Sequence, residues 1–384
     1  MDEALAAVGD AASPARCLLL THKTVRAVPL AQSAAARAAA DAAVDTARLL
    51  DDPAAVPFAL VARMWSLLGS PVRPELRDAP ADALAFTAPP ELGVSLRVFV
   101  VPMLPMVPLH MGERAEVDAV RDTVAADPHT RGSKHLAAYV QMWDGALALA
   151  AGRLDVAEHL ATTILAAGDS SVWADVSALQ TIVVGMERGD PTVGFRLEAY
   201  LSVVQRSDVA QSLLTSLAAA AGDQALAYRH IDVLRRATPD DLGWCAPLTY
   251  RHLAEAAAHL GDRELAAELL PETSRYAGQL LVSFAATTLD AAADRAIGQN
   301  LMVLGRLDEA VERLRSARAF EQAFGADALA ARSGYWLARA LLDRRGPGDG
   351  DAARRLLHEA AAEAQKLGME GLHRDLQVVL AAGG

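Results

Sequence analysis

The amino-acid sequence predicts an all-α protein, an α-solenoid built from consecutive helix pairs. Alanine supplies 83 of the 384 residues and aromatic residues only 5%, a composition that favours helices over sheets. A glycine followed by a polar step and an Ala/Leu-patterned helix recurs along most of the chain. No stretch shows the pattern expected of a strand hairpin or of strands alternating with helices.

The recurring glycines define the predicted helix pairs. They lie 33 to 45 residues apart, at Gly112, Gly152, Gly189, Gly222, Gly261, Gly305 and Gly350. Glycine just past a helix tolerates the left-handed conformation that ends it, and an acid soon afterwards suits the first turn of the next helix. Each interval holds two helices of about a dozen residues, the unit of helix-pair repeats.

The helix after Gly305 shows the expected apolar stripe. Leu307, Ala310, Val311 and Leu314 fall at positions i, i+3, i+4 and i+7. The small side chain of Ala310 allows a neighbouring helix to approach closely.

Two segments resemble the opening of the second helix of a tetratricopeptide repeat: residues 304–310 (LGRLDEA) and residues 151–157 (AGRLDVA). The order of motifs near the end of the chain is similar to the repeat region of actinobacterial multidomain ATPase regulators of the AfsR, LuxR and cyclase-linked types. The motifs in this order lie at residues 335–342, 345–354 and 364–369. Residues 136–160 and 243–262 are also similar to that repeat region. The resemblance covers residues 135–372 well and residues 20–134 loosely.

The resemblance implies divergent helical repeats over residues 1–134 and tetratricopeptide-like repeats over residues 135–384, in one continuous superhelix. In its usual setting such an array accompanies a P-loop ATPase domain and an output domain. The sequence contains no Gly-x4-Gly-Lys-Ser/Thr motif and no basic helix-turn-helix segment. We therefore expect either a free-standing relative or a fragment of a larger regulator.

The net charge and the hydropathy pattern limit which binding partners and which cellular compartment are expected. A net charge of −12 and a pI near 5.3 argue against direct nucleic-acid binding. The longest apolar stretch, residues 98–109, is too short to span a membrane and contains three prolines. Without a recognisable signal segment, we expect a cytoplasmic protein. Cys17 and Cys245 fit neither a disulfide framework nor a zinc site, and packing is the expected role of both.

No motif predicts catalysis, a metal or a cofactor. The sequence lacks a Gly-x-Ser-x-Gly elbow and a His-Glu-x-x-His motif. His252, Glu255 and His259 share one helix face, but no fourth ligand is evident, which favours a solvated or locally hydrogen-bonded face over a metal site. The glycine-rich segment 346–351 falls where a turn between helices is expected. We therefore predict a protein that is not an enzyme.

Residues 97–111 interrupt the helical pattern. Pro102, Pro105 and Pro108 cannot lie in an undistorted helix, while Met103 and Met106 offer adaptable apolar surface. The segment fits either a small-molecule pocket or a distorted element buried in the core, and the second interpretation is favoured because apolar stretches usually pack.

Aromatic residues on the first helices of the predicted pairs are candidates for lining a concave groove, where solenoids usually bind. Together with the proline-rich segment they give the candidate ligand or partner residues: Arg97, Met103, Met106, His110, Tyr139, Trp143, Trp173, Tyr228 and Trp244. If this groove exists, a Trp143→Ala substitution should weaken binding more than stability.

Two functions are consistent with these patterns. The first is a non-catalytic binding module that senses a small-molecule effector or a partner protein within a signalling or transcription-regulatory system. The alternative is a free-standing small-molecule-binding protein or enzyme with an apolar pocket near residues 97–143. That alternative requires titratable groups to converge there, for which Arg97, His110, His135 and Asp144 are the candidates.

Overall fold

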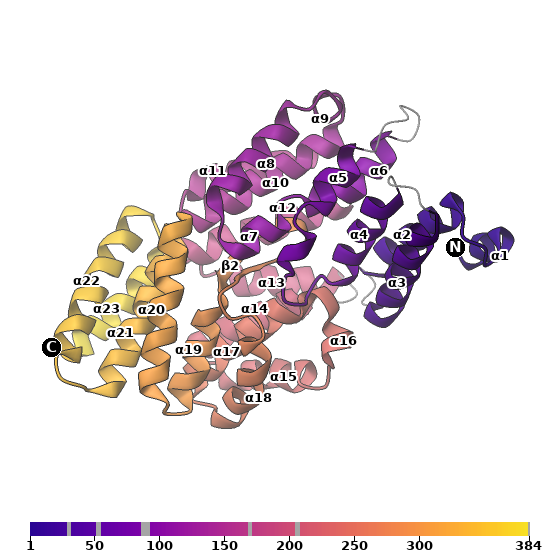
Figure 1. Ribbon diagram of the computed structural model, residues 1–384. Coiled ribbons are helices and arrows are strands. Elements are labelled where there is room, and N and C mark those ends of the chain that lie inside the picture. Colours follow the sequence, from indigo (N-terminus) through magenta and orange to yellow (C-terminus); the bar gives the residue numbers. More distant parts are fainter. Residues whose placement is uncertain (29–31, 51–54, 86–92, 168–170, 204–207, 383–384) are drawn as a thin grey trace. The chain divides into compact units, whose positions relative to one another are not determined.

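A computed structural model describes residues 1–28, 32–50, 55–85, 93–167, 171–203 and 208–382. The described chain is mostly α-helical and forms two compact units (Figure 1). Unit 1 comprises Met1–Leu109, Ala115–Val140 and Ala237–Ala246, and unit 2 comprises His110–Arg114, Gln141–Arg236 and Pro247–Gly384. None of the described helices has the length and apolar character needed to cross a membrane.

Unit 1 has a small core where α2, α3 and α4 pack together. Cys17, Leu20, Ala43 and Ala59 are buried there, and Cys245 is buried elsewhere in this unit. The unit contains all or most of α1 (Asp2–Val8), α2 (Pro14–Ala27), α3 (Ser33–Leu50), α4 (Ala55–Ser66), η1 (Pro74–Leu76), α5 (Ala79–Ala85), α6 (Gly93–Val100), η2 (Val101–Met103), α8 (Arg114–Ala126), α9 (Pro128–Gly132), α16 (Pro239–Leu242) and η4 (Gly243–Cys245).

The proline-rich segment is broken as its sequence predicts. Helix α6 ends at Val100, the 3-10 turn η2 follows, and a new helix, α7 (Met106–Met111), begins after Pro105. Met103 and Met106 are buried, as the core interpretation of this segment requires.

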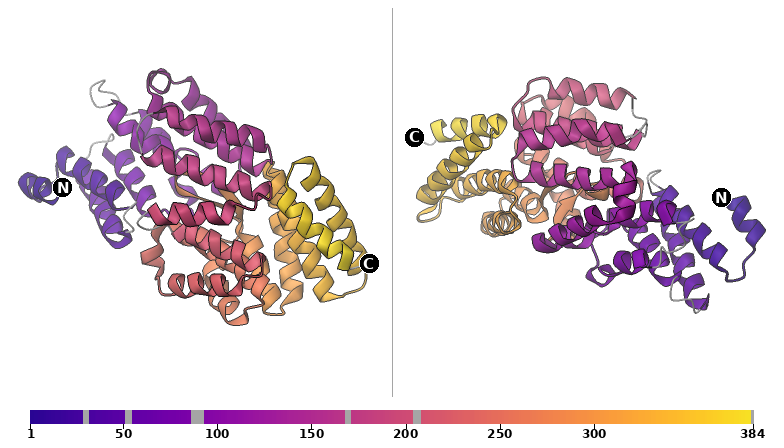
Figure 2. Two further views of the ribbon diagram at one scale, coloured as in Figure 1. Left: turned by 180° about the vertical axis from the view of Figure 1, so that it is seen from behind. Right: turned by 90° about the horizontal axis from the view of Figure 1, so that it is seen from above.

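In unit 2, helices pack against their neighbours in the sequence (Figures 1 and 2). The succession from α18 to α23 is the most regular part, and each of these helices contacts the next. The unit contains α11 (Leu154–Thr163), η3 (Ile164–Ala167), α12 (Ser171–Glu187), α13 (Val193–Val203), α14 (Asp208–Ala220), α15 (Gln224–Leu234), α18 (Arg263–Ser274), α19 (Ala293–Val303), α20 (Leu307–Phe324), α21 (Asp327–Arg344), α22 (Asp349–Lys366) and α23 (Glu370–Ala382). Residues of α7, α10 (Lys134–Ala150) and α17 (Ala246–Leu260) are divided between the two units.

The glycine pattern correctly predicts most of the turns between helices at which a glycine has positive φ. Six of the seven predicted glycines have positive φ: Gly112, Gly152, Gly189, Gly222, Gly261 and Gly305. The prediction for Gly350 is wrong, because this residue lies in the first turn of α22 and the left-handed glycine is Gly348. Asp349 sets this geometry: its carboxylate accepts hydrogen bonds from Arg344 Nη2 at 2.7 Å and from the Gly346 amide at 2.7 Å, which closes the turn earlier than predicted.

The last described helix pair contacts an earlier part of unit 2. Arg374 Nη2 donates to the Gly189 carbonyl at 3.0 Å, so α23 lies against the turn after α12. On α21, Arg332 pairs with Glu187 at the end of α12. The side chains between these helices therefore form an interior.

A two-stranded antiparallel hairpin lies between α18 and α19, formed by β1 (Leu280–Val282) and β2 (Leu289–Ala292). The prediction that no hairpin occurs is wrong. Strands of three and four residues are too short to show alternation, and almost every strand side chain is buried, so the sequence reads like any apolar helix segment.

Gly189 and Gly222 offer a matched test of the helix-ending turns. A Cβ at Gly189 would lie 2.9 Å from the Gly371 amide nitrogen, whereas a Cβ at Gly222 would meet open space. Because a left-handed alanine costs roughly 1–2 kcal/mol, we expect Gly222→Ala to lower the free energy of unfolding by about that amount. Gly189→Ala should lower it further, because α23 must also shift. Urea denaturation measures both, and equal losses would contradict the proposed packing of α23.

Candidate functional site

The hairpin between α18 and α19 is the centre of the candidate site. Its base is joined where the Ala293 amide donates to the Gln279 carbonyl at 2.9 Å. Its tip is closed by Ser283, whose amide donates to the Thr288 carbonyl at 3.0 Å. Most hairpin residues are less than 6% exposed. The backbone groups that the two short strands leave unpaired must therefore find partners inside the protein.

Side chains from five helices supply such partners. His110 Nδ1 donates to the Leu280 carbonyl at 2.7 Å, Trp143 Nε1 to the Ala285 carbonyl at 3.1 Å, Gln180 Nε2 to the Thr287 carbonyl at 2.8 Å and Arg295 Nη2 to the Asp290 carbonyl at 2.8 Å; Glu321 Oε1 accepts from the Ala292 amide at 3.0 Å. We call His110, Trp143, Gln180, Arg295 and Glu321 the cradle. Its contacts are with backbone groups of the two strands and of the turn between them.

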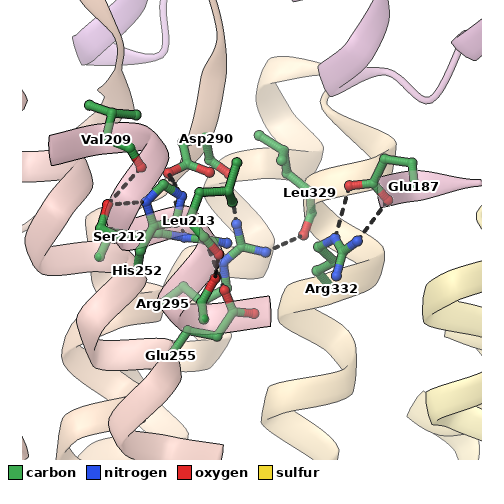
Figure 3. Close-up of polar contacts among 12 residues, drawn as sticks. Glu187, Val209, Ser212, Leu213, His252, Glu255, Asp290, Arg295, Leu329 and Arg332 are labelled. Atoms are coloured by element: carbon green, nitrogen blue, oxygen red, sulfur yellow. Dashed lines mark hydrogen bonds and ion pairs between the residues drawn. The ribbon is translucent and has the colours of Figure 1, made fainter. Parts of the chain in front are cut away.

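One hairpin side chain is also recognised. Asp290 lies at a β-bulge, since Leu281 pairs with Ala291 and Val282 with Leu289. A bulge redirects a side chain, and here the carboxylate faces α17. Asp290 Oδ2 lies 3.3 Å from His252 Nε2 and 3.6 Å from Arg251 Nε (Figure 3).

Further buried charges surround this contact. Arg251 Nη1 lies 2.9 Å from Glu255 Oε2 on the same helix. Burial opposes ionisation of Glu255, but Arg251 and Arg332 outweigh it and hold the pKa of this carboxyl at about 2. Glu187 accepts two hydrogen bonds from Arg332, at 3.1 and 2.9 Å, in the parallel geometry that suits a guanidinium (Figure 3). These groups are therefore ionised and paired.

The pair of Arg295 and Glu321 is less well compensated. Their nearest charged atoms are 4.0 Å apart, and both side chains are at most 1% exposed. Burial lowers the pKa of Arg295 and raises the pKa of Glu321. Replacing such a pair with apolar residues is often neutral or stabilising. A role in recognition therefore explains these two residues better than stability does, because each also holds the hairpin backbone.

Two buried histidines are held in the neutral form. Burial lowers the pKa of His110 to about 4, although the hydrogen bond to Leu280 opposes the shift. Burial likewise lowers the pKa of His252 to about 4, although Asp290 opposes it. His252 is also fixed by Ser212, whose Oγ lies 2.9 Å from Nδ1 (Figure 3). Both rings therefore act as neutral hydrogen-bonding groups near neutral pH.

The tip of the hairpin carries backbone strain. Ala285 and Ala286 have φ of 52° and 65°, a region that is unfavourable for residues with a Cβ. Trp143 and Gln180 bind the carbonyls on either side of this turn and hold it in place.

The cradle includes two of the residues predicted from the sequence, His110 and Trp143. Trp173 belongs to the same unit and is fully buried, whereas Tyr228 is 38% exposed on α15. The other predicted residues belong to unit 1: Arg97, Met103, Met106, Tyr139 and Trp244. Of these, Arg97 pairs with Asp127, and burial raises the pKa of Tyr139 to about 12.

The indole of Trp143 is 2% exposed, which changes the meaning of the Trp143→Ala test. Removing a buried tryptophan typically destabilises a protein by roughly 3–5 kcal/mol, so a loss of folding would mask a loss of binding. Trp143→Phe, which removes the Nε1 donor and keeps most of the packing, is the more selective variant.

The face formed by His252, Glu255 and His259 is buried or half-buried, not solvated. Each side chain has a local partner: Asp290 for His252, Arg251 for Glu255 and the ring of Trp336 for His259. Among the described residues, no group of three or more His, Cys, Asp or Glu side chains is arranged to hold a metal ion.

Sequence reasoning missed Gln180, Arg295, Glu321 and the bulge at Asp290, although two of these left a signal. Gln180 lies midway between Val176 and Val184 on the apolar stripe of α12, and all three are buried. Glu321 occupies the same kind of position between Ala317 and Phe324 on α20. A polar residue on an apolar stripe indicates a buried hydrogen-bonding partner elsewhere.

No protein-family model matches this chain, and no curated protein is recognisably similar to it. The candidate site therefore rests on the geometry described above.

The neutral histidines predict a loss of stability in mild acid. Between pH 6.5 and 4 the unfolded chain binds protons that the folded chain does not, so stability falls as the pH falls. Each histidine should contribute about 1.4 kcal/mol per pH unit in this window. His252→Gln should reduce the slope of unfolding free energy against pH, while the control His358→Gln, on an exposed surface of α22, should not. An unchanged slope in His252→Gln would contradict the neutral assignment.

Proposed function

We propose that this chain is a non-catalytic helical-repeat module that binds an extended segment of a partner protein within a signalling or transcription-regulatory system. One observation carries the proposal: five cradle side chains, from different helices, are hydrogen-bonded to backbone groups of one short buried hairpin. An interior that already recognises a peptide backbone is suited to binding another peptide.

The chemistry of the cradle favours a protein partner over a small effector. Its groups match peptide carbonyls and amides spaced along a chain, and main-chain hydrogen bonding is the usual source of affinity for extended peptides. Helical repeats provide long surfaces of this kind without preorganised catalytic groups. The alternative of an apolar pocket near residues 97–143 is not favoured, because Met103 and Met106 fill space in the core.

The resemblance of residues 304–310 and 151–157 to tetratricopeptide repeats supports the same proposal. It supports a tetratricopeptide-like solenoid and suggests the regulatory setting, because such arrays accompany ATPase and output domains. The sequential packing of helix pairs and the six left-handed glycines agree with this family.

The proposal predicts that the cradle binds the hairpin in trans. Replacing residues 280–292 with a short Gly-Ser linker should be sterically possible, because Gln279 and Ala293 are hydrogen-bonded neighbours. We expect the excised chain to bind a synthetic peptide of residues 278–293, measured by calorimetry. Gln180→Ala or Trp143→Phe in the excised chain should weaken binding about fivefold, the effect of one hydrogen bond worth roughly 1 kcal/mol.

A folded excised chain that does not bind the peptide would refute the proposal. If excision prevents folding, Ala285→Pro provides a second route. Proline fixes φ near −65° and cannot adopt the 52° of Ala285, so the tip should leave Trp143 while the strands remain in the chain. Peptide binding to this variant then tests the same cradle.

A further inference from the structure

We propose that residues 280–292 are an exchangeable internal ligand, which a partner displaces by inserting an apolar hairpin-forming segment that carries a carboxylate. This inference rests on the proposed function and adds its regulation: the chain occupies its own binding site until a matching segment replaces the hairpin.

The first argument is the place of the hairpin in the chain. Helix α18 ends at Ser274 and α19 begins at Ala293, yet these two helices pack directly against each other. The hairpin is thus an insertion between the members of a helix pair. Its base is narrow, because Ala293 is bonded to Gln279 and the Gly278 amide donates to Asp294 at 2.7 Å. It can therefore leave the interior as a unit without separating α18 from α19.

The second argument is the strain at the tip. Ala285 and Ala286 both hold left-handed conformations that a glycine would adopt freely. Both conformations are unfavourable for alanine, and this strain is released when the hairpin leaves the cradle. A partner segment with glycine at these two turn positions would bind the same groups without that strain.

The third argument is that an empty cradle is less stable than an occupied one. Without the hairpin, Gln180 and Arg295 would each lose a buried hydrogen-bond partner, which is unfavourable, although Glu255 would still pair with Arg251. A matching segment that restores these hydrogen bonds therefore stabilises the open state. The incoming segment must supply backbone carbonyls for His110 and Gln180 and a carboxylate for Arg251.

The chemistry of the hairpin defines the partner. Leu280, Leu281, Val282 and Leu289 are buried, so the partner segment requires branched apolar residues. Asp290 requires an acidic residue opposite Arg251 and His252, and the buried alanines after it leave room only for small residues. The expected partner is a hairpin-forming protein segment with branched apolar residues, then one acid, then small residues.

Hydrogen exchange of the intact chain tests whether the hairpin opens by itself. We expect amides of residues 280–292 to exchange at least tenfold faster than those of α17 and α19. Ala285→Gly, which relieves strain, should slow this exchange two- to fivefold, and Ala285→Pro should accelerate it. Exchange of the hairpin only together with the flanking helices would overturn the proposal, whether or not the proline variant folds.

Peptide competition tests the replacement step. The peptide of residues 278–293 should bind Ala285→Pro at least tenfold more tightly than Ala285→Gly, and a peptide with Asp290→Asn should bind Ala285→Pro at least fivefold more weakly. Equal binding to both variants would place the peptide elsewhere and overturn the proposal. Binding by the excised chain together with a hairpin that never opens would leave the proposed function intact and remove only this inference. Failure of the excised chain to bind would remove both.

Discussion

The backbone groups of one short buried hairpin organise the interior of unit 2. Two strands of three and four residues satisfy few of their own carbonyls and amides, and an unpaired buried backbone group costs roughly 1–3 kcal/mol. The surrounding helices must therefore present donors and acceptors where the interior of a helical unit would otherwise be apolar. Gln180 and Glu321, each on an apolar stripe, follow directly from this constraint.

The charges around Asp290 are an indirect consequence of the need to satisfy the backbone groups of the hairpin. Arg295 is buried because it donates to the Asp290 carbonyl, and its buried charge needs a counterion. Among the ion pairs of the described residues, Glu321 is the acid that lies within 4.0 Å of it. Arg251 pairs with Glu255 for the same reason. The network is thus a consequence of holding an extended segment inside a helical unit, and its incomplete compensation at Arg295 and Glu321 is consistent with selection for recognition over stability.

The sequence predicts the local features and misses the non-local ones. Glycine turns and the stripe from Leu307 to Leu314 depend on residues within one or two helical turns, so their patterns are visible in the chain. The hairpin depends on partners up to 170 residues away, such as His110 for Leu280, and its strands are too short to show a period. The prediction for Gly350 is wrong for a local reason, because the Asp349 carboxylate closes the turn two residues earlier. The sequence predicts Trp143 as a groove residue because of its aromatic ring, but its hydrogen bond to the hairpin is made by Nε1.

In the proposed site, contacts to the backbone provide affinity, and contacts to the Asp290 side chain provide specificity. The cradle contacts groups that every peptide has, so by itself it discriminates poorly among extended segments. Asp290 supplies the discriminating contact, because a segment without an acid at that position would leave Arg251 and His252 facing a buried side chain of the wrong polarity. The hairpin already satisfies both requirements from within the chain, so weak general binders are excluded. Under the proposed displacement, a partner must match both the carboxylate and the backbone contacts, so the occupied state would also select among partners.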